Sequence, residues 1–185
     1  VSGATFTTDR FDQSDKAYNF IYNGFSSDKI EVSGTSGFNF SSGGFSISAW
    51  VKFSGPGVVG NNYPIFSKHI CGEQSGYILM LYNDKLTFWL AGSDGYNVLS
   101  TPDNYTDNSW HQVVAVYDDL NQYIYVEKIK KNSVPFVYSV YNSANWALGG
   151  YNGCNGGFNG KVDEIKIHHR PLSAVEILEE YNNTV

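Results

Sequence analysis

Residues 45–53 read Phe-Ser-Ile-Ser-Ala-Trp-Val-Lys-Phe, a segment in which two kinds of side chain alternate. Every second residue from Phe45 to Phe53 is apolar, whereas Ser, Trp and Lys fill the positions between them. Successive side chains of a β-strand point to opposite faces of a sheet, so this pattern is typical of a strand with one face in a core. The segment therefore predicts one strand of a two-layer sandwich.

Similar short segments follow along the chain. Residues 77–82 and 85–91 are separated by Asn83-Asp84, a two-residue connection that is typical of an antiparallel hairpin. Alternation in the second segment places Trp89 on the outward face. Regular short strands with turn signals between them predict an antiparallel sandwich or jelly roll. Further strands are expected within residues 110–118, 121–129, 133–140 and 160–169, with turns at Asp118-Asp119 and Lys131-Asn132.

One helix is predicted, near the C-terminal end of the sequence. Ser173 and Glu176 have capping-box spacing and lead into apolar residues with helical spacing. We interpret this helix as a lid on one end of the sandwich. With no internal repeat or linker in view, residues 1–185 are expected to form a single all-β domain, a two-sheet antiparallel β-sandwich with one short C-terminal helix.

Composition agrees with this fold and limits the partners. The chain has 185 residues, a formal net charge of −6, and only 16% charged residues, well below the usual ~25%. Scattered basic residues argue against nucleic acid as a partner, and no apolar run approaches the ~20 residues of a membrane helix, so membrane insertion is not expected. The sequence begins at Val1 without a signal region, and we expect a processed secreted protein or a module of a longer chain.

Two cysteines, Cys71 and Cys154, each lie in a loop rich in Gly and Asn. Two exposed loop cysteines favour a disulfide formed in an oxidising compartment, and hence a secreted or cell-surface protein. The alternative is a pair of reduced cysteines in a cytosolic protein. Their spacing does not match a zinc or redox motif.

The same two loops contain side chains suited to binding sugars. Glycans are held by aromatic faces that stack on the pyranose ring and by amides or charged groups that bind hydroxyls. A disulfide would hold the two loops side by side and pre-organise these groups. The predicted ligand-binding residues are Lys68, His69, Glu73 and Tyr77 in the first loop, Tyr151, Asn152 and Asn155 in the second, and Trp89 on the outward face of its strand, with Gln74 and Phe158 as further candidates.

Several motifs resemble the laminin-G-like, concanavalin A-like jelly-roll superfamily, in the form found in secreted bacterial multidomain proteins. They are Asp9-Arg10-Phe11, Trp110-His111, and Gly160 to Glu164 running into Arg170-Pro-Leu-Ser173. The resemblance implies a concanavalin A-like jelly roll over nearly the whole chain, with Trp50 and Trp110 in its core. The superfamily includes carbohydrate-binding modules, adhesion domains, lyases and hydrolases, so the resemblance does not select among them.

The resemblance also implies a structural Ca²⁺ ion between the N-terminal segment and the last strand. The positions that match are Asp9, Asp12 and Asp163, which would supply the oxygen ligands that Ca²⁺ prefers. The alternative for Asp9 and Asp12 is a turn or cap, and for Asp163 a hydrogen bond to backbone or to Arg170.

The acidic residues do not form the array that a glycoside hydrolase needs. Acid and base must flank one bond at about 5–10 Å, yet no Glu-x-Asp-x-Glu pattern is present. We therefore expect a non-catalytic, lectin-like carbohydrate-binding module of a secreted or cell-surface multidomain protein, attached to other domains. The alternatives are a protein-binding adhesion domain of the same fold and, third, a hydrolase or a polysaccharide lyase, for which His69 with Tyr77 is the plausible start.

Overall fold

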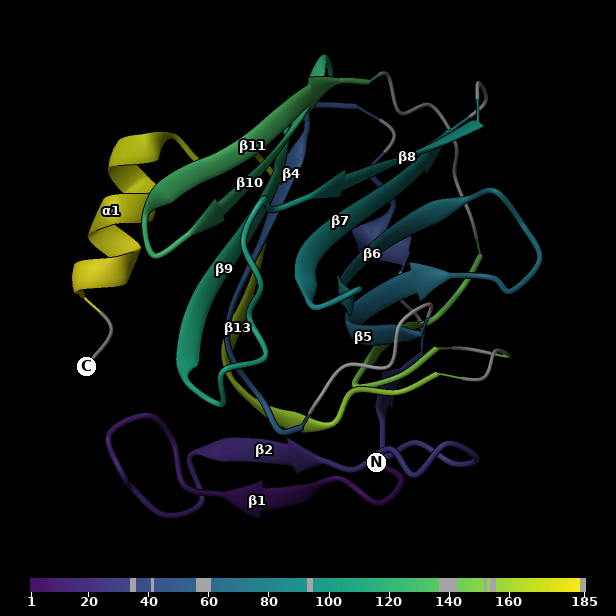
Figure 1. Ribbon diagram of the computed structural model, residues 1–185. Helices are drawn as coiled ribbons and strands as arrows, with labels where there is room; N and C mark the ends of the chain where they lie inside the picture. Colours follow the sequence, from purple (N-terminus) through teal and green to yellow (C-terminus); the bar gives the residue numbers. More distant parts are fainter. Residues whose placement is uncertain are drawn as a thin grey trace.

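Two antiparallel sheets face each other in the computed structural model, which describes residues 1–33, 36–40, 42–55, 61–92, 95–136, 143–151, 153 and 156–183 (Figure 1). The seven-stranded sheet has the order β1 (Thr5–Thr7), β2 (Ala17–Phe20), β13 (Gly160–His168), β4 (Phe45–Phe53), β9 (Trp110–Tyr117), β10 (Asn121–Val126) and β11 (Ile129–Pro135). The six-stranded sheet has the order β3 (Ile30–Val32), β12 (Trp146–Leu148), β5 (Asn62–His69), β6 (Gly76–Tyr82), β7 (Lys85–Gly92) and β8 (Gly95–Ser100). A short 3₁₀ helix covers Ser36–Phe38.

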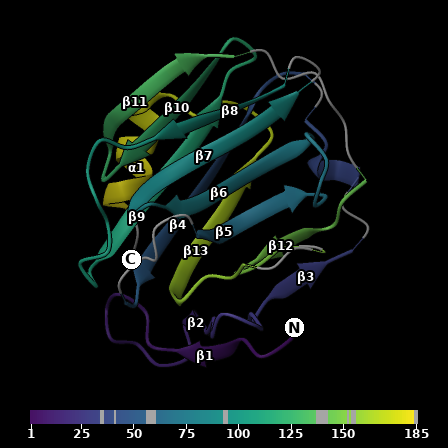
Figure 2. The ribbon, with the colours of Figure 1, turned by 45° about the vertical axis from the view of Figure 1, so that its right-hand side comes forward.

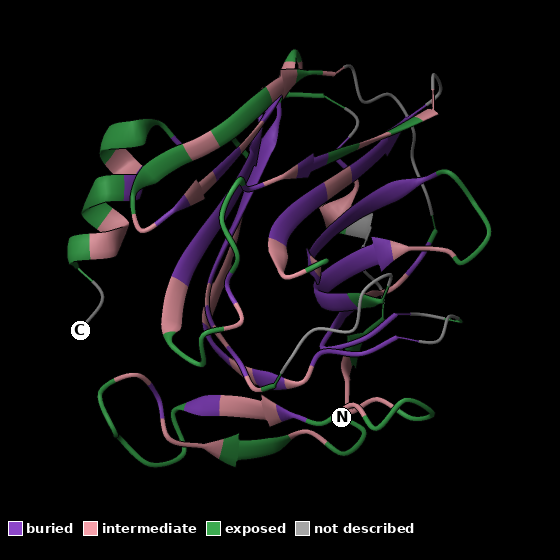
Figure 3. Cartoon of the chain, in the orientation of Figure 1, coloured by how far each residue is buried: buried purple, intermediate pink, exposed green. Residues whose placement is uncertain are grey.

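The core lies between the two sheets, as the alternation in residues 45–53 predicts. Phe45 of β4 packs against Tyr77 at 4.8 Å and Phe88 at 6.0 Å between ring centroids, and both partners belong to the opposite sheet. Buried residues line the facing surfaces of both sheets (Figure 3). The all-β, two-sheet sandwich predicted from sequence is thus confirmed.

The hairpin turns follow the local sequence in one case and depart from the prediction in another. Asn83 and Asp84 have φ angles of 49° and 66° and join β6 to β7, as expected. The turn between β10 and β11 lies instead at Glu127-Lys128, with φ of 50° and 65°, because Lys131 and Asn132 lie within β11, where Asn132 pairs with Ile124 of β10. The predicted turn at Lys131-Asn132 was wrong, and residues 137–140 of that predicted strand lie outside the described residues.

Helix α1 (Ala174–Asn182) begins where predicted but lies elsewhere on the sandwich. Ser173 is its N-cap and forms a capping box with Glu176. Ile177 packs with Val114 and Val116 of β9, so the helix covers the outer face of the seven-stranded sheet rather than one end of the sandwich (Figure 2). Within the described part of the chain, no helix is long and apolar enough to cross a membrane.

Arg10 ties the N-terminal segment to the seven-stranded sheet. Its guanidinium donates to Asp163 at 2.8 Å and to Glu164 at 3.0 Å, and lies 4.6 Å from the ring centroid of Trp50. Trp50 also stacks on Tyr181 of α1 at 5.6 Å. The expectation that Trp50 lies in the core was therefore wrong, since the even-numbered positions of β4 face outward.

Candidate functional site

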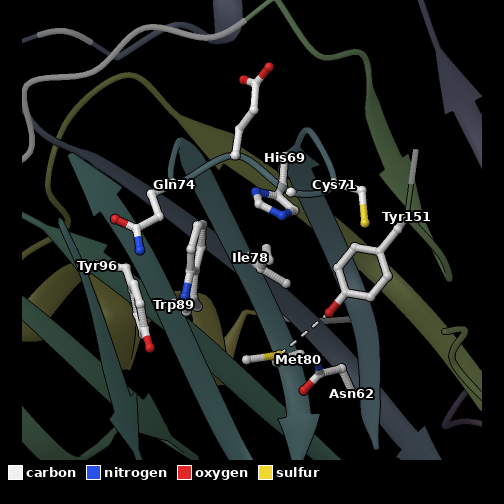
Figure 4. Close-up of a pocket in the computed structure, with 11 residues that line it drawn as sticks. Asn62, His69, Cys71, Gln74, Ile78, Met80, Trp89, Tyr96 and Tyr151 are labelled. Carbon is white, nitrogen blue, oxygen red and sulfur yellow. Dashed lines mark hydrogen bonds between the residues drawn. The ribbon is translucent and has the colours of Figure 1, made fainter. Parts of the chain in front are cut away.

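A groove of about 480 Å³ lies on the outer face of the six-stranded sheet. Ile78 and Met80 of β6 form its floor, and aromatic side chains from neighbouring elements form its walls (Figure 4). The connection between β5 and β6 forms one rim. The lining residues on that rim are His69, Cys71, Gly72, Glu73 and Gln74.

The floor exists because β6 is apolar on both faces. Leu79 and Leu81 belong to the main core, whereas Ile78 and Met80 form a separate outer cluster with Tyr151. The hydroxyl of Tyr151 donates to the sulfur of Met80 at 3.7 Å. Burial of this phenol raises the pKa of Tyr151, so the hydroxyl keeps its proton at neutral pH.

Four rings stand around this floor. Trp89 of β7 stacks beside Tyr96 of β8, with ring centroids 5.9 Å apart and an angle of 27° between the planes. His69 meets Trp89 edge-on at 4.9 Å and Tyr151 at 6.3 Å. Figure 4 shows Trp89 between Tyr96 and Ile78, with Tyr151 across the groove. The groove therefore has flat aromatic walls on two sides.

The rim is polar. Nδ1 of His69 lies 2.9 Å from the carbonyl oxygen of Ser75, so this nitrogen carries the proton and donates it. The hydroxyl of Ser75 in turn donates to Glu73 at 3.2 Å. Glu73 and Gln74 are exposed and free to meet a ligand from solvent. At the other end of the groove, Asn62 offers a second side-chain amide.

Such a groove suits a ring that is apolar on its faces and polar at its edge. A pyranose packs its C–H groups on an aromatic face while its hydroxyls reach amides and carboxylates. Among the described lining residues, Glu73 is the one carboxylic acid.

Comparison with known proteins adds an independent line of evidence. A family model described as the concanavalin A-like lectin/glucanases superfamily matches residues 23–178. The chain belongs to this superfamily. A comparison with curated protein sequences found no match.

Solved structures share the fold of this concanavalin A-like domain at low sequence identity. The binding domain of Paraclostridial Mosquitocidal Protein 1 aligns with a TM-score of 0.78 and 17% identity, over 98% of this chain and 46% of that chain. The receptor binding domain of botulinum neurotoxin D gives 0.75 and 18%, over 98% and 46%. A structure titled for the dependence of botulinum neurotoxin C cell entry on two ganglioside molecules gives 0.69 and 16%, over 98% and 46%. The domain thus spans less than half the length of each neighbour.

Of the predicted ligand-binding residues, His69, Glu73, Trp89 and Tyr151 come together in the groove of the concanavalin A-like domain. The outward orientation predicted for Trp89 is confirmed by its place in the wall. Gln74, the further candidate, also lines the groove.

Tyr77 and Lys68 do not reach the groove, and their assignment to a ligand site was wrong. They are a cross-strand pair at the end of β5 and the start of β6, and both point into the sandwich. Tyr77 is 0% exposed and donates its hydroxyl to the carbonyl oxygen of Phe38 at 2.9 Å. Lys68 is 2% exposed, its ammonium donates to the carbonyl oxygen of Ala144, and burial lowers the pKa of Lys68.

The second cysteine loop is described only in part. Asn152, Cys154 and Asn155 lie outside the described residues, so their predicted roles and the disulfide to Cys71 stay predictions. Phe158 is a core residue in contact with Phe20 and Phe53, which excludes it from a surface site.

Four groove side chains, those of Asn62, Ile78, Met80 and Tyr96, were missed from sequence. Tyr96 and Val98 occupy every second position of residues 95–100, which indicates a strand with both side chains on one face. That pattern could have placed Tyr96 on the same face as Trp89. No local signal separates the outer pair Ile78 and Met80 from the inner residues of the continuous apolar run. Asn62 also carries no distinguishing pattern.

Two of the three residues predicted to bind calcium, Asp9 and Asp163, have protein partners. Asp9 accepts hydrogen bonds from the backbone N–H groups of Phe11 at 2.8 Å and Gln13 at 2.9 Å, the turn that was the alternative. Asp163 is ion-paired with Arg10, and within the described ranges no three His, Cys, Asp or Glu side chains form a group that could hold a metal. Arg10 thus supplies one positive charge beside Asp163, where the predicted ion would act. Binding by Asp9, Asp12 and Asp163 stays a prediction.

A second depression, of about 320 Å³, lies on the outer face of the seven-stranded sheet. Trp50, Trp110 and Tyr181 line it together with Arg10 and Phe11. Trp50 is already engaged by Arg10 and Tyr181, so this aromatic cluster joins the N-terminal segment and α1 to the sheet. Trp110 lies on the opposite sheet from the groove, so it serves as a tryptophan control for Trp89.

Proposed function

We propose that this domain is a non-catalytic glycan-binding module that holds a pyranose ring in the groove between Trp89 and Tyr151. The observation that carries this proposal is the combination of two aromatic walls, the apolar floor of Ile78 and Met80, and a polar rim. A flat apolar face beside side-chain amides matches the two surfaces of a sugar ring. A volume of about 480 Å³ also lies within the ~300–1,000 Å³ range of ligand sites.

The chemistry of the groove favours binding over cleavage. A glycoside hydrolase needs two carboxyl groups about 5–10 Å apart across the scissile bond, whereas Glu73 is the one acid among the described lining residues. A lyase that used His69 and Tyr77 would need both side chains at the substrate. Tyr77 is in the core, and Nδ1 of His69 is engaged by Ser75.

The neighbours in structure support a recognition role for this fold. Their titles name binding and receptor binding domains, and one names ganglioside molecules, but the likeness covers under half of each of those chains. We infer that this domain works as one module of a larger secreted or cell-surface protein. A disulfide between Cys71 and Cys154 would fit that location and brace the rim, since Cys71 lines the groove and Tyr151 precedes Cys154 by three residues.

A second candidate, a protein-binding adhesion domain, is favoured by the neighbours named as receptor binding domains. It would use a broad surface of several hundred Å² rather than one groove.

The test is a glycan array followed by isothermal titration calorimetry. Wild type and Trp110→Ala are expected to bind the same glycans, and Trp89→Ala is expected to lose at least about tenfold in affinity. Binding that survives Trp89→Ala at full strength would contradict the groove as the site. Absence of any glycan binding, together with capture of a purified protein receptor, would support the adhesion domain instead.

A further inference from the structure

The groove that we propose as the glycan site has an acidic side chain but no Lys or Arg among its described lining residues. Of its described lining residues, Glu73 carries a full negative charge and none is Lys or Arg. The residues outside the described ranges contain no Lys, Arg or His either, so they bring no basic side chain to the groove.

Two lysines that neighbour groove residues, Lys68 and Lys29, have partners elsewhere. Lys68 precedes His69, but alternation along β5 turns it into the sandwich, where its ammonium donates to the carbonyl oxygen of Ala144. Lys29 lies beside Gly150, next to Tyr151 in sequence, but its ammonium pairs with Glu31 at 3.2 Å. Neither ammonium is a groove-lining group.

The polar atoms of the rim are rich in acceptors. Nδ1 of His69 donates to the carbonyl oxygen of Ser75, and in that tautomer of the imidazole Nε2 is an acceptor. The hydroxyl of Ser75 orients the Glu73 carboxylate, which accepts hydrogen bonds and repels other anions. The amides of Gln74 and Asn62 donate as well as accept.

We propose that this groove selects uncharged sugars and rejects glycans whose bound residue carries a carboxylate or sulfate. This inference rests on the proposed function and names the class of glycan. A neutral sugar donates hydrogen bonds from its hydroxyls to Glu73 and His69 and stacks its C–H face on Trp89. An acidic sugar loses hydration beside the apolar floor and finds a carboxylate there instead of a cation.

The experiment compares matched pairs of glycans. An array that carries neutral oligosaccharides, together with versions bearing one sialic acid, uronic acid or sulfate group, identifies the neutral binder. Calorimetry at pH 8, where imidazole groups are generally neutral, then compares this oligosaccharide with its singly acidic counterpart. We expect the neutral member to bind at least about tenfold more tightly, and the ratio to shrink as salt is raised from 20 to 300 mM.

Variants at Glu73 locate the cause of the selectivity. Glu73→Gln is expected to reduce the neutral-to-acidic ratio severalfold, and Glu73→Lys to reverse the preference, while Trp89→Ala weakens both members of the pair. Since Glu73 is exposed, the melting temperature serves as the folding control and should remain unchanged.

The outcomes separate the two claims. If an acidic glycan binds equally or more tightly and its binding still depends on Trp89, the selectivity is overturned while the glycan-binding function stands. If no glycan binds at all, the proposed function itself is overturned, and the selectivity with it.

Discussion

Trp89 and Tyr96 stack with their ring centroids 5.9 Å apart and their planes 27° apart. Tyr96, which is 55% exposed, lies on one side of Trp89, and Ile78 of the groove floor lies on the other (Figure 4). An aromatic ring that is already held in place loses little conformational entropy when a ligand packs against it. The pair therefore pre-organises one wall of the groove.

This relationship predicts different effects for two substitutions at Tyr96. Tyr96→Phe keeps the stacked ring and should bind glycan as wild type does, whereas Tyr96→Ala should lower affinity about threefold to tenfold by freeing Trp89. Calorimetry measures both. In the Trp89→Ala background the Tyr96→Ala effect should vanish, and an additive loss would show that Tyr96 acts independently of Trp89.

The core position of Tyr77 predicts an effect on stability rather than on binding. Tyr77→Ala should lower the free energy of unfolding by about 3–5 kcal/mol, because it leaves a cavity between the sheets. Tyr77→Phe should cost about 1 kcal/mol through loss of the hydrogen bond to Phe38. Urea denaturation measures both values. Loss of glycan binding by a stable Tyr77→Phe protein would contradict the core assignment.

Alternation placed β4, β7 and Trp89 correctly, because one face of each of those segments is apolar and the other is not. The run Tyr77 to Tyr82 has no such contrast: its outer residues form the groove floor and its inner residues the core. Sequence reasoning therefore took Tyr77 as a loop residue. Lys68 was misplaced for a related reason, since β5 extends through His69 and buries a residue type that is almost never fully buried without a partner.

The contacts of Trp50 and the position of α1 depend on segments that are distant in sequence. Arg10 and Tyr181 both pack against Trp50, although they are 171 positions apart in the sequence. No local pattern indicates that these two residues share a partner. The capping box, by contrast, is a local motif and was predicted from two residues, Ser173 and Glu176.

The ion pair between Arg10 and Asp163 predicts that Arg10→Ala loses stability in a pH-dependent way. Burial raises the pKa of Asp163, and Arg10 offsets part of that rise. Arg10→Ala should destabilise the domain by about 3 kcal/mol at pH 7, because Asp163 is left charged without its partner. A carboxyl whose folded-state pKa lies above its unfolded value favours folding when protonated, so the deficit against wild type should shrink as pH falls through that pKa.

The control for this ion pair is the Arg10→Ala/Asp163→Asn double variant. Its loss of stability against wild type should not shrink as pH falls. Denaturation midpoints at pH 7 and pH 5 provide the comparison. If the deficit of the single variant grows toward acid pH instead, Asp163 is not the group that Arg10 supports.

Calcium should contribute little to stability, because Arg10 occupies the position beside Asp163 where a cation would act. Thermal melts of the wild type in chelator and in millimolar CaCl₂ are expected to coincide. A midpoint that rises by several degrees with calcium, and loses this rise in Asp9→Asn, would show that the predicted ion site forms after all.

The attachment of α1 should weaken in acid. A hydrogen bond from Arg170, with further bonds from Ser173, lowers the pKa of Glu176 from 4.5 to about 2. A carboxyl whose folded-state pKa is lower than its unfolded pKa stabilises the fold at pH values above the unfolded pKa. This contribution is lost as pH falls from about 4.5 toward 2. The protection factor of the Ile177 amide, which corrects the exchange rate for its intrinsic pH dependence, should fall over that window.

Two variants check the helix N-terminus. Glu176→Gln should abolish this pH dependence of the amide protection at Ile177. Ser173→Ala should lower the free energy of unfolding by about 1 kcal/mol at neutral pH through loss of the N-cap. Identical acid responses in Glu176→Gln and wild type would assign the effect to another group.

The central claim is that glycan binds on the outer face of the six-stranded sheet. A crystal structure with the neutral oligosaccharide from the array tests it most directly. We expect a pyranose ring packed on Trp89 above Ile78, with hydroxyls in hydrogen-bond distance of Glu73 or Gln74. A sugar bound instead beside Trp110 on the opposite sheet, with the Trp89 groove open to solvent, would contradict the account.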